Sequence, residues 1–239
     1  MKKLRIGYFA DGPWAHQALA KLLADETIEI AFICARDEKP DEVLRLESIK
    51  HQIDFFSHPE INSIEFYNII SKYNCDIFVS MSFNQIFKKK LFNLPPLSTI
   101  NCHAGKLPYY RGRNVLNWVL INDEKDFGIT VHYVDEGIDT GDIILQRSYS
   151  IDDTDDYSTL LARSYQECSL ILYDAIKIIQ QGNVDRIVQT NINALGFYCI
   201  SRKEGDEVLD WNQNSRDIFN FVRALCHPGP RARTILYGK

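Results

Sequence analysis

The sequence predicts an α/β fold: a Rossmann-like, mostly parallel twisted sheet with helices on both faces, plus a small C-terminal appendage. Short apolar runs alternate with helical patterns over residues 6–80. This alternation is typical of parallel strands joined by right-handed helical crossovers. The length of 239 residues is enough for one large domain, with or without an appendage.

The first part of the chain is expected to supply the parallel strands and their crossover helices. Strands are expected at residues 6–10, 28–34, 53–56 and 76–80. Helices are expected at 15–23, 41–50 and 63–73. Open parallel sheets bind ligands beyond the carboxyl ends of their strands. The loops of interest are therefore 11–14, 36–40, 81–87 and the segment after Ile100.

From Thr99 onward the character of the sequence changes. A strand at 99–103 runs into a loop, 104–113, that is rich in Gly, Pro and basic residues. Beyond that loop we expect a helix at 114–121, strands at 128–134 and 143–149 that flank an acidic loop, and a long amphipathic helix at 156–181. The apolar residues of this last helix recur at helical spacing.

The C-terminal segment is predicted to hold a strand at 196–201, a helix at 215–226 and a final strand at 231–237. His227-Pro228-Gly229-Pro230 ends the helix. We divide the chain into a catalytic domain, 1–200, and an appendage, 201–239, whose apolar residues would suit the interface of a homodimer.

Composition and charge narrow the function. A net charge of −5 argues against nucleic acid as a partner, because phosphate neutralisation needs a basic face. The first apolar run, Leu4–Ala10, is too short for a signal peptide or a membrane span, so we expect a cytoplasmic protein. Six scattered cysteines without a CxxC pair predict neither a metal site nor a disulfide framework. The loop Asp11–Trp14 lacks the glycine pattern of a dinucleotide site.

Three side chains suggest chemistry. Asn101 and His103 are two apart on a predicted strand, so both face the same side, and Asp139 lies in the acidic loop. An amide, an imidazole and a carboxylate suit the addition of an amine to a formyl carbon. His103 would remove the amine proton, worth about 10² to 10⁴-fold. Asp139 would stabilise the charged imidazole.

In the same scheme, Asn101 and the imidazolium would stabilise the oxyanion, at about 3 kcal/mol per donor. A purely structural interpretation fits the same residues, because a histidine at a strand end is often structural and Asp and Gly are common turn formers. Calcium is disfavoured, because residues 135–142 lack the ligand order of an EF-hand loop and its closing Glu.

The same residues resemble a known family. The run Asn101–Arg113, the run Gly128–His132 and the loop Asp135–Gly141 resemble the N-x-H-x-S-x-L-P and D-x-G-x-D-x-G segments of the folate-dependent formyltransferases, in the same order and at the same separation. That family includes methionyl-tRNA, glycinamide ribonucleotide and sugar-nucleotide N-formyltransferases. The resemblance is strong over 76–146, and Ala104-Gly105-Lys106 departs from the family's small-Ser-Leu stretch.

The resemblance implies a catalytic triad of Asn101, His103 and Asp139 and a co-substrate, 10-formyltetrahydrofolate. It places this formyl donor beside the residues of two loops and one arginine: Gln85, Ile86, Phe87, Arg113, Asp135, Glu136, Gly137 and Ile138.

The C-terminal segment, 201–239, suggests which amine accepts the formyl group. The segment Leu209–Trp211 and the helix after it resemble the sugar-nucleotide branch, as does Tyr110–Trp118. We therefore expect a nucleotide-linked amino sugar, specifically a dTDP-linked 4-amino-4,6-dideoxyhexose used for O-antigen in lipopolysaccharide biosynthesis. Its candidate contacts are Trp14, Lys106, Tyr110, Arg111, Trp211 and Arg223. Each cation is equally suited to a surface ion pair, and each tryptophan to core packing.

Two other functions fit the sequence. A hydrolase of the deformylase type would pass the formyl group to water and release formate without an amine. A non-catalytic ligand-binding module would keep its function when His103 is replaced by alanine.

Overall fold

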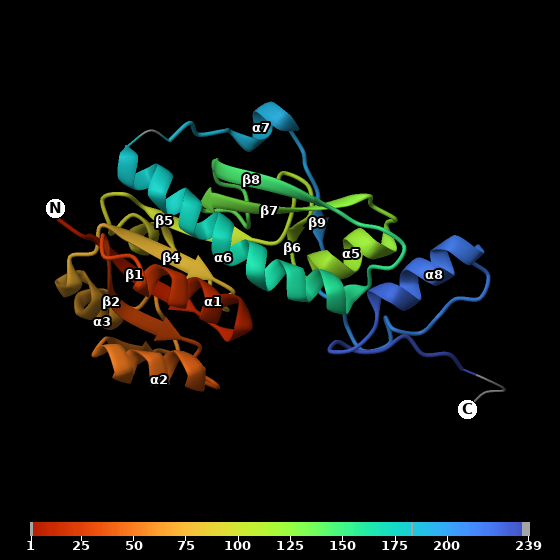
Figure 1. The fold of residues 1–239 in the computed structure, drawn as a ribbon, viewed down its shortest axis with the longest axis horizontal. Helices are drawn as coiled ribbons and strands as arrows, with labels where there is room; N and C mark the ends of the chain where they lie inside the picture. The colour runs from red at the N-terminus through yellow and green to blue at the C-terminus, as the bar shows by residue number, and fades with distance from the viewer. Residues whose placement is uncertain (1, 183, 236–239) are drawn as a thin grey trace.

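The computed structural model describes residues 2–182 and 184–235. Its centre is a seven-stranded sheet in the order β3-β2-β1-β4-β5-β7-β8 (Figure 1). The strands are β1 Leu4–Ala10, β2 Ile28–Ala35, β3 Asp54–Ser57, β4 Ile77–Met81, β5 Thr99–His103, β7 Asp126–Tyr133 and β8 Ile143–Ser150. A second, two-stranded sheet pairs β6 Arg111–Gly112 with β9 Tyr198–Cys199 in parallel.

The main sheet has a parallel part and an antiparallel part. Strands β3, β2, β1, β4 and β5 are all parallel to their neighbours. Strands β7 and β8 join them in antiparallel pairings, β5 with β7 and β7 with β8. The predicted mostly parallel, Rossmann-like sheet is confirmed. The change of direction at β5 matters for the site, because β5 carries Asn101 and His103.

The helices cover both faces of the sheet, as predicted. Their bounds are α1 Gly12–Leu23, α2 Glu42–His51, α3 Ile64–Ile70, α4 Lys89–Phe92, α5 Val115–Ile121, α6 Tyr157–Gln181, α7 Gln189–Ile192 and α8 Ser215–Ala224, with a 3₁₀ turn at Ser71–Tyr73. The short helices α4 and α7 carry too few residues for a periodic apolar pattern, and the sequence did not indicate them.

Alternation along β1 divides the core in two. Ile6 and Tyr8 belong to the cluster that α1, α5 and α6 bury on one face of the sheet. Phe9 faces the other side, where it meets Phe32 and Phe78 edge to face with ring centroids 5.5 and 5.2 Å apart. The sheet is therefore buried on both faces, as its apolar strands require.

The C-terminal segment departs from its predicted strands. The strand expected at 196–201 shortens to β9, because its partner β6 has only two residues. The strand expected at 231–237 does not form over the described residues 231–235, where a single bridge joins Arg233 to Val208. Leu236 and Tyr237 lie outside the described residues. A strand needs a neighbour to take up its backbone hydrogen bonds, and only Leu209 and Glu207 bond with Arg233 here.

Helix α8 is held to the body of the protein by buried polar contacts. The Asn117 side chain of α5 donates a hydrogen bond to the Ala224 carbonyl at 2.7 Å. Arg223, 7% exposed, donates to the Asp152 carbonyl at 2.8 Å. Among the described residues, no helix combines the length and apolar character needed to cross a bilayer.

Candidate active site

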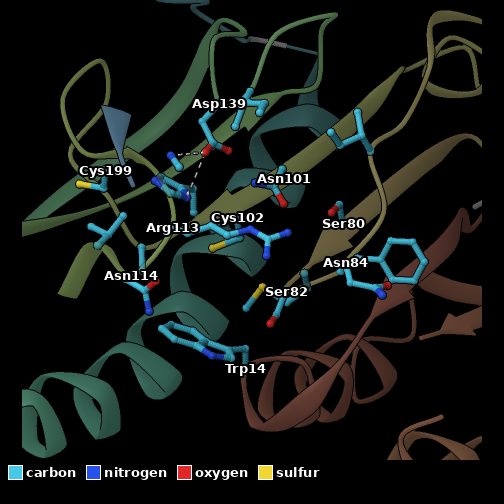
Figure 2. A pocket seen from close by; sticks show the side chains of 18 of the residues that line it. Trp14, Ser80, Ser82, Asn84, Asn101, Cys102, Arg113, Asn114, Asp139 and Cys199 are labelled. Carbon is cyan, nitrogen blue, oxygen red and sulfur yellow. Dashed lines mark hydrogen bonds and ion pairs between the residues drawn. The ribbon is translucent and has the colours of Figure 1, made fainter. Parts of the chain in front are cut away.

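The candidate site is a cavity of about 690 Å³ at the carboxyl edge of the sheet. Strand β5 brings Asn101 and His103 to its wall, and the loop between β7 and β8 brings Asp139 (Figure 2). The three side chains that the sequence singled out therefore meet in one place. Switch points of α/β sheets are where such cavities form.

His103 is held in a defined tautomer. Its Nε2 lies 2.7 Å from the Tyr110 carbonyl oxygen, and because a carbonyl only accepts, Nε2 must carry the hydrogen. In the neutral ring Nδ1 is then an acceptor. That atom lies 3.6 Å from Asp139 Oδ2, too far for a good hydrogen bond but close enough for strong attraction once the ring is protonated.

Local backbone geometry produces this contact. Tyr110 has a φ of +57°, an uncommon conformation for an aromatic residue, and its carbonyl bonds to the imidazole. Gly105 lies against both groups: a Cβ at this position would come within 2.4 Å of His103 Nε2 and of the Tyr110 oxygen. A side chain at this position would therefore require His103 or the Tyr110 carbonyl to shift.

Asp139 is the most highly connected group of the site. It has a φ of +54°, and its Oδ2 accepts a hydrogen bond from the Gly112 amide at 2.9 Å. Burial raises the pKa of this carboxyl. The charges that His103 and His132 carry when protonated, together with the hydrogen bond from the Gly112 amide, lower it by more, so the pKa lies well below its usual range. Asp139 is thus a carboxylate beside His103 at neutral pH.

His132 is a site residue whose role the sequence did not indicate. It is 2% exposed and lies opposite Asn101 in the β5–β7 pairing. Its Nδ1 donates to the Tyr133 carbonyl at 2.8 Å, so Nε2 of the neutral ring accepts from Asn101 Nδ2 at 3.2 Å. Asp139 Oδ1 lies 3.4 Å from the same Nε2. Only strand register reveals this contact, because 31 positions separate the two side chains.

Through His132, the amide of Asn101 has a fixed orientation. One of its two N–H groups is taken by the histidine, and the second remains for a group inside the cavity. Two imidazoles and a carboxylate meet here, yet within the part of the chain that the structure describes no three such groups are arranged to hold a metal ion. The arrangement offers a proton acceptor, a fixed anion and an N–H donor.

Most residues expected near the formyl donor line the cavity. Gln85, Ile86, Phe87, Arg113, Asp135, Gly137 and Ile138 do so. Ile86 and Ile138 are 65% and 51% exposed apolar side chains, and an apolar ligand would cover them. Glu136 points elsewhere and lies 3.5 Å from the ammonium of Lys89.

Two of these residues shape the loops around the cavity through their side chains. Gln85 accepts from the Ile61 amide and donates to the His58 carbonyl, which anchors the loop after β4. Asp135 accepts from the Gly137 amide and the Thr140 hydroxyl, which folds the acidic loop. These hydrogen bonds fix the loops, so that their backbone groups and the exposed side chains of Ile86 and Ile138 are presented to a ligand.

Of the six residues expected at the acceptor, only Trp14 lines the cavity. The other five bind elsewhere in the protein: Lys106 pairs with Asp126, the Tyr110 hydroxyl bonds to Glu124, Arg111 bonds to Gln189, Trp211 donates to Thr234 and Arg223 binds backbone carbonyls. Basic residues in a Gly-rich loop suggested exposure, but Arg111 is only 6% exposed. We do not carry these five into the acceptor site.

The cavity also contains polar side chains from the loops 36–40 and 81–87, which the sequence indicated without singling out these two residues. Arg36 pairs with Asp11 at 2.8 Å, yet its buried Nε has no partner among the described residues. Asn84 donates to Glu38, and its buried Oδ1 likewise has no partner among them. Unpaired buried polar atoms are rare in folded proteins, and both of these belong to residues that line the cavity. Arg36 follows directly after β2, and this position at the carboxyl end of a parallel strand is what points to it as a candidate ligand contact.

Comparisons with known proteins show the family to which the chain belongs. A family model described as formyl transferase matches residues 4–176. The methionyl-tRNA formyltransferase of Syntrophus aciditrophicus (strain SB) is 33% identical over 247 residues, which cover 100% of this chain and 78% of that protein. The bifunctional polymyxin resistance protein ArnA of Wigglesworthia glossinidia brevipalpis is 33% identical over 196 residues, and they cover 82% of this chain but 30% of that protein.

Solved structures share the fold. A sugar N-formyltransferase from Shewanella sp. FDAARGOS_354 superposes with a TM-score of 0.77 at 21% identity, covering 98% of this chain and 93% of that one. An N-formyltransferase from Helicobacter canadensis, solved in complex with folinic acid and dTDP-3-aminofucose, has a TM-score of 0.69 at 22% identity and coverage of 94% and 80%. With the family match over residues 4–176 and a relative 33% identical along the whole chain, the protein belongs to the formyl transferase family.

Proposed function

We propose that this protein transfers a formyl group from 10-formyltetrahydrofolate to the amine of a nucleotide-linked amino sugar. The observation that carries the proposal is His103: its tautomer presents Nδ1 as a proton acceptor beside the buried carboxylate of Asp139. Asn101, with an N–H left for a ligand, lies on the same wall. These are the groups that formyl transfer to an amine requires.

The residues around the cavity fit a folate. The volume of about 690 Å³ lies in the usual range for small-molecule sites. Ile86 and Ile138 offer apolar surface to its rings, and the loops anchored by Gln85 and Asp135 offer backbone groups to a pterin edge. When bound, 10-formyltetrahydrofolate supplies the formyl carbon. The likeness to the Helicobacter canadensis enzyme, which holds folinic acid, supports this choice of donor.

Each of the three catalytic side chains has a separate role in this proposal. His103 Nδ1 accepts the proton that the attacking amine loses as its bond to the formyl carbon forms. His103 then returns this proton to the donor nitrogen whose bond to the formyl carbon breaks, and its Nε2–H stays bonded to the Tyr110 carbonyl throughout. Asp139 stabilises the imidazolium that results, because its low pKa keeps it charged. The free N–H of Asn101 stabilises the negative oxygen that develops on the formyl carbon, a contribution of about 3 kcal/mol where such donors have been removed.

We propose that the acceptor binds beside Trp14, Arg36 and Asn84, which also line the cavity. Arg36 and Asn84 are the polar residues there, and Trp14 offers an aromatic face. Arg113, which the resemblance assigns to the formyl donor, has no ion pair among the described residues, and its guanidinium faces the same space in Figure 2. This combination suits a sugar carrying phosphates and a base. Our specific proposal is a dTDP-linked 4-amino-4,6-dideoxyhexose for surface polysaccharide.

A second acceptor is favoured by one observation. The curated relatives include methionyl-tRNA formyltransferases, one of them 33% identical over the whole chain. The net charge of −5 is a poor match for transfer RNA. Because of the sequence relatives, and despite this charge, we keep methionyl-tRNA as an alternative acceptor.

Mass spectrometry identifies the acceptor. The protein is incubated with 10-formyltetrahydrofolate and a panel of nucleotide-linked amino sugars, and methionyl-tRNA is included as a separate arm. We expect one amino sugar to gain a single formyl group, with no product in the tRNA arm. Formylation of methionyl-tRNA alone would overturn the sugar proposal while retaining the reaction type.

A further inference from the structure

Gln189 lies outside the matched family region yet contacts the loop of the candidate catalytic carboxylate. It is the first residue of α7 and is 1% exposed. Its amide nitrogen donates to two carbonyl oxygens of that loop, those of Asp139 at 2.9 Å and Gly141 at 2.7 Å. Its amide oxygen accepts two hydrogen bonds from Arg111, from Nη2 at 2.8 Å and Nε at 3.1 Å. Both donors of this side chain and both lone pairs of its oxygen are therefore used.

Arg111 is a buried cation held without a carboxylate. It is 6% exposed, and it forms no ion pair with any residue that the structure describes. Besides Gln189, its Nη1 donates to the Leu195 carbonyl at 3.3 Å, and its guanidinium lies 5.4 Å from the centre of the Tyr198 ring. Burying a charge in this way is costly unless its hydrogen bonds are satisfied. All these partners lie in residues 189–198, so this segment and Arg111 stabilise each other.

The same short strand acts on Asp139 from a second direction. Gly112, next to Arg111 in β6, donates its amide to Asp139 Oδ2 at 2.9 Å. Gly112 has a φ of +92°, and a Cβ there would come within 2.4 Å of the Cys199 carbonyl, so the pairing of β6 with β9 requires glycine. Asp139 is therefore fixed at its side chain by Gly112 and at its backbone by Gln189. Its own φ of +54° is unfavourable for a non-glycine residue and needs such support.

We propose that Gln189 and Arg111 are positioning residues that hold the loop of Asp139 in the geometry that the reaction needs. The charge of Arg111 polarises the Gln189 amide, which strengthens the two hydrogen bonds to the loop. Residues 189–198 then support the catalytic centre from outside the family match, which ends at 176. The inference rests on the proposed function for its kinetic readout.

The test compares Gln189→Leu with Asn191→Leu, a matched control on an exposed amide of the same short helix. We expect kcat of Gln189→Leu to fall by about 10²-fold, the size of effect that a misplacement of 1 Å produces, with KM values for donor and acceptor near those of the wild type. Asn191→Leu should keep the wild-type kcat.

Gln189→Glu tests the same claim without removing the partner of Arg111. A carboxylate here pairs with the guanidinium but has no N–H for the loop, so this variant should fold and still lose kcat. If Gln189→Leu does not fold, Gln189→Glu decides. A folded Gln189→Glu with wild-type kcat would overturn the inference.

Hydrogen exchange separates this inference from the proposed function. Residues 135–142 should exchange faster in both Gln189 variants than in the wild type and in Asn191→Leu. The exchange rate of this loop can be measured whether or not the protein is active. A wild-type protein that transfers no formyl group would therefore contradict the proposed function but not this inference. Unchanged exchange in this loop would contradict the inference alone.

Discussion

The two sides of the cavity differ in how their polar groups are satisfied. The histidine side consists of Asn101, His103, His132 and Asp139. The arginine side consists of Trp14, Arg36, Asn84 and Arg113. On the histidine side, each of these residues contacts another polar group of the protein, and Gly112, Tyr110 and Tyr133 add backbone contacts. On the arginine side, two buried polar atoms have no partner among the described residues. Figure 2 shows Trp14 and Asn84 across the open space from Asp139.

This difference indicates a division of function. Groups that are fixed before a ligand arrives can stabilise developing charge without rearranging, which is how electrostatic catalysis works. Polar groups that line the cavity without such a network can gain partners from a ligand, so they contribute to affinity and selectivity. We therefore expect substitutions on the histidine side to lower kcat and substitutions on the arginine side to raise KM.

The largest expected effect is that of His103→Ala. Without the proton acceptor, kcat should fall by about 10² to 10⁴-fold, while the folate still binds through the loops on either side. Steady-state kinetics and a binding titration with the folate measure the two quantities. His51→Ala, an exposed histidine on α2, is the control. Full turnover by His103→Ala would show that the histidine side has no catalytic role.

Gly105→Ala tests whether the fixed tautomer matters apart from the imidazole itself. The new methyl group would collide with His103 Nε2 and the Tyr110 oxygen, so their hydrogen bond should break. We expect a loss of up to about 10²-fold in kcat with all four side chains of the histidine side still present. Circular dichroism checks the fold. A folded variant with unchanged kcat would mean that the Tyr110 contact is dispensable.

Arg36→Gln tests the arginine side. It removes the charge and the unpaired Nε–H, and the KM of the acceptor should rise about tenfold, the value of one hydrogen bond to a charged group, with kcat little changed. Arg45→Gln, an exposed arginine on α2, should leave both constants unchanged. A fall in kcat with constant KM would break the proposed division between the two sides.

The smallest expected effect is on stability. The pKa of Asp139 is lowered in the folded protein, so its charge stabilises the fold above the unfolded pKa of about 3.9, and this contribution is lost as pH falls through the folded value. Asp139→Asn should therefore lower the free energy of unfolding at pH 7, and the difference from wild type should shrink below about pH 4. Denaturant titrations at both pH values measure this difference. A constant difference would show that the charge is not the cause.

The sequence could predict those features of the fold and the site that depend on neighbouring residues in the chain. Asn101 and His103 are two apart on an apolar strand, so local alternation was enough to place both on one wall. The sheet itself followed from alternating strands and helices, and its predicted parallel character is confirmed. Local patterns succeed where neighbouring residues in the chain determine the structure.

Contacts between distant segments could not be predicted in this way. His132 joins the site because β7 pairs antiparallel with β5, and Gln189 because its helix packs behind a loop 50 residues earlier. Arg111 looks like a surface ligand in the sequence, yet the structure surrounds it with residues 189–198. In each case the deciding partner lies far away in the chain, and no local pattern records it.

The most direct test of the proposed reaction is a mass balance on the formyl donor. The wild-type protein is mixed with 10-formyltetrahydrofolate, with and without the amino sugar identified by mass spectrometry, and both formate and formylated product are measured. We predict one formylated amine for each donor consumed, and no consumption of the donor without the amine. Formate released at the same rate in the absence of the amine would contradict formyl transfer and show that the protein is a hydrolase.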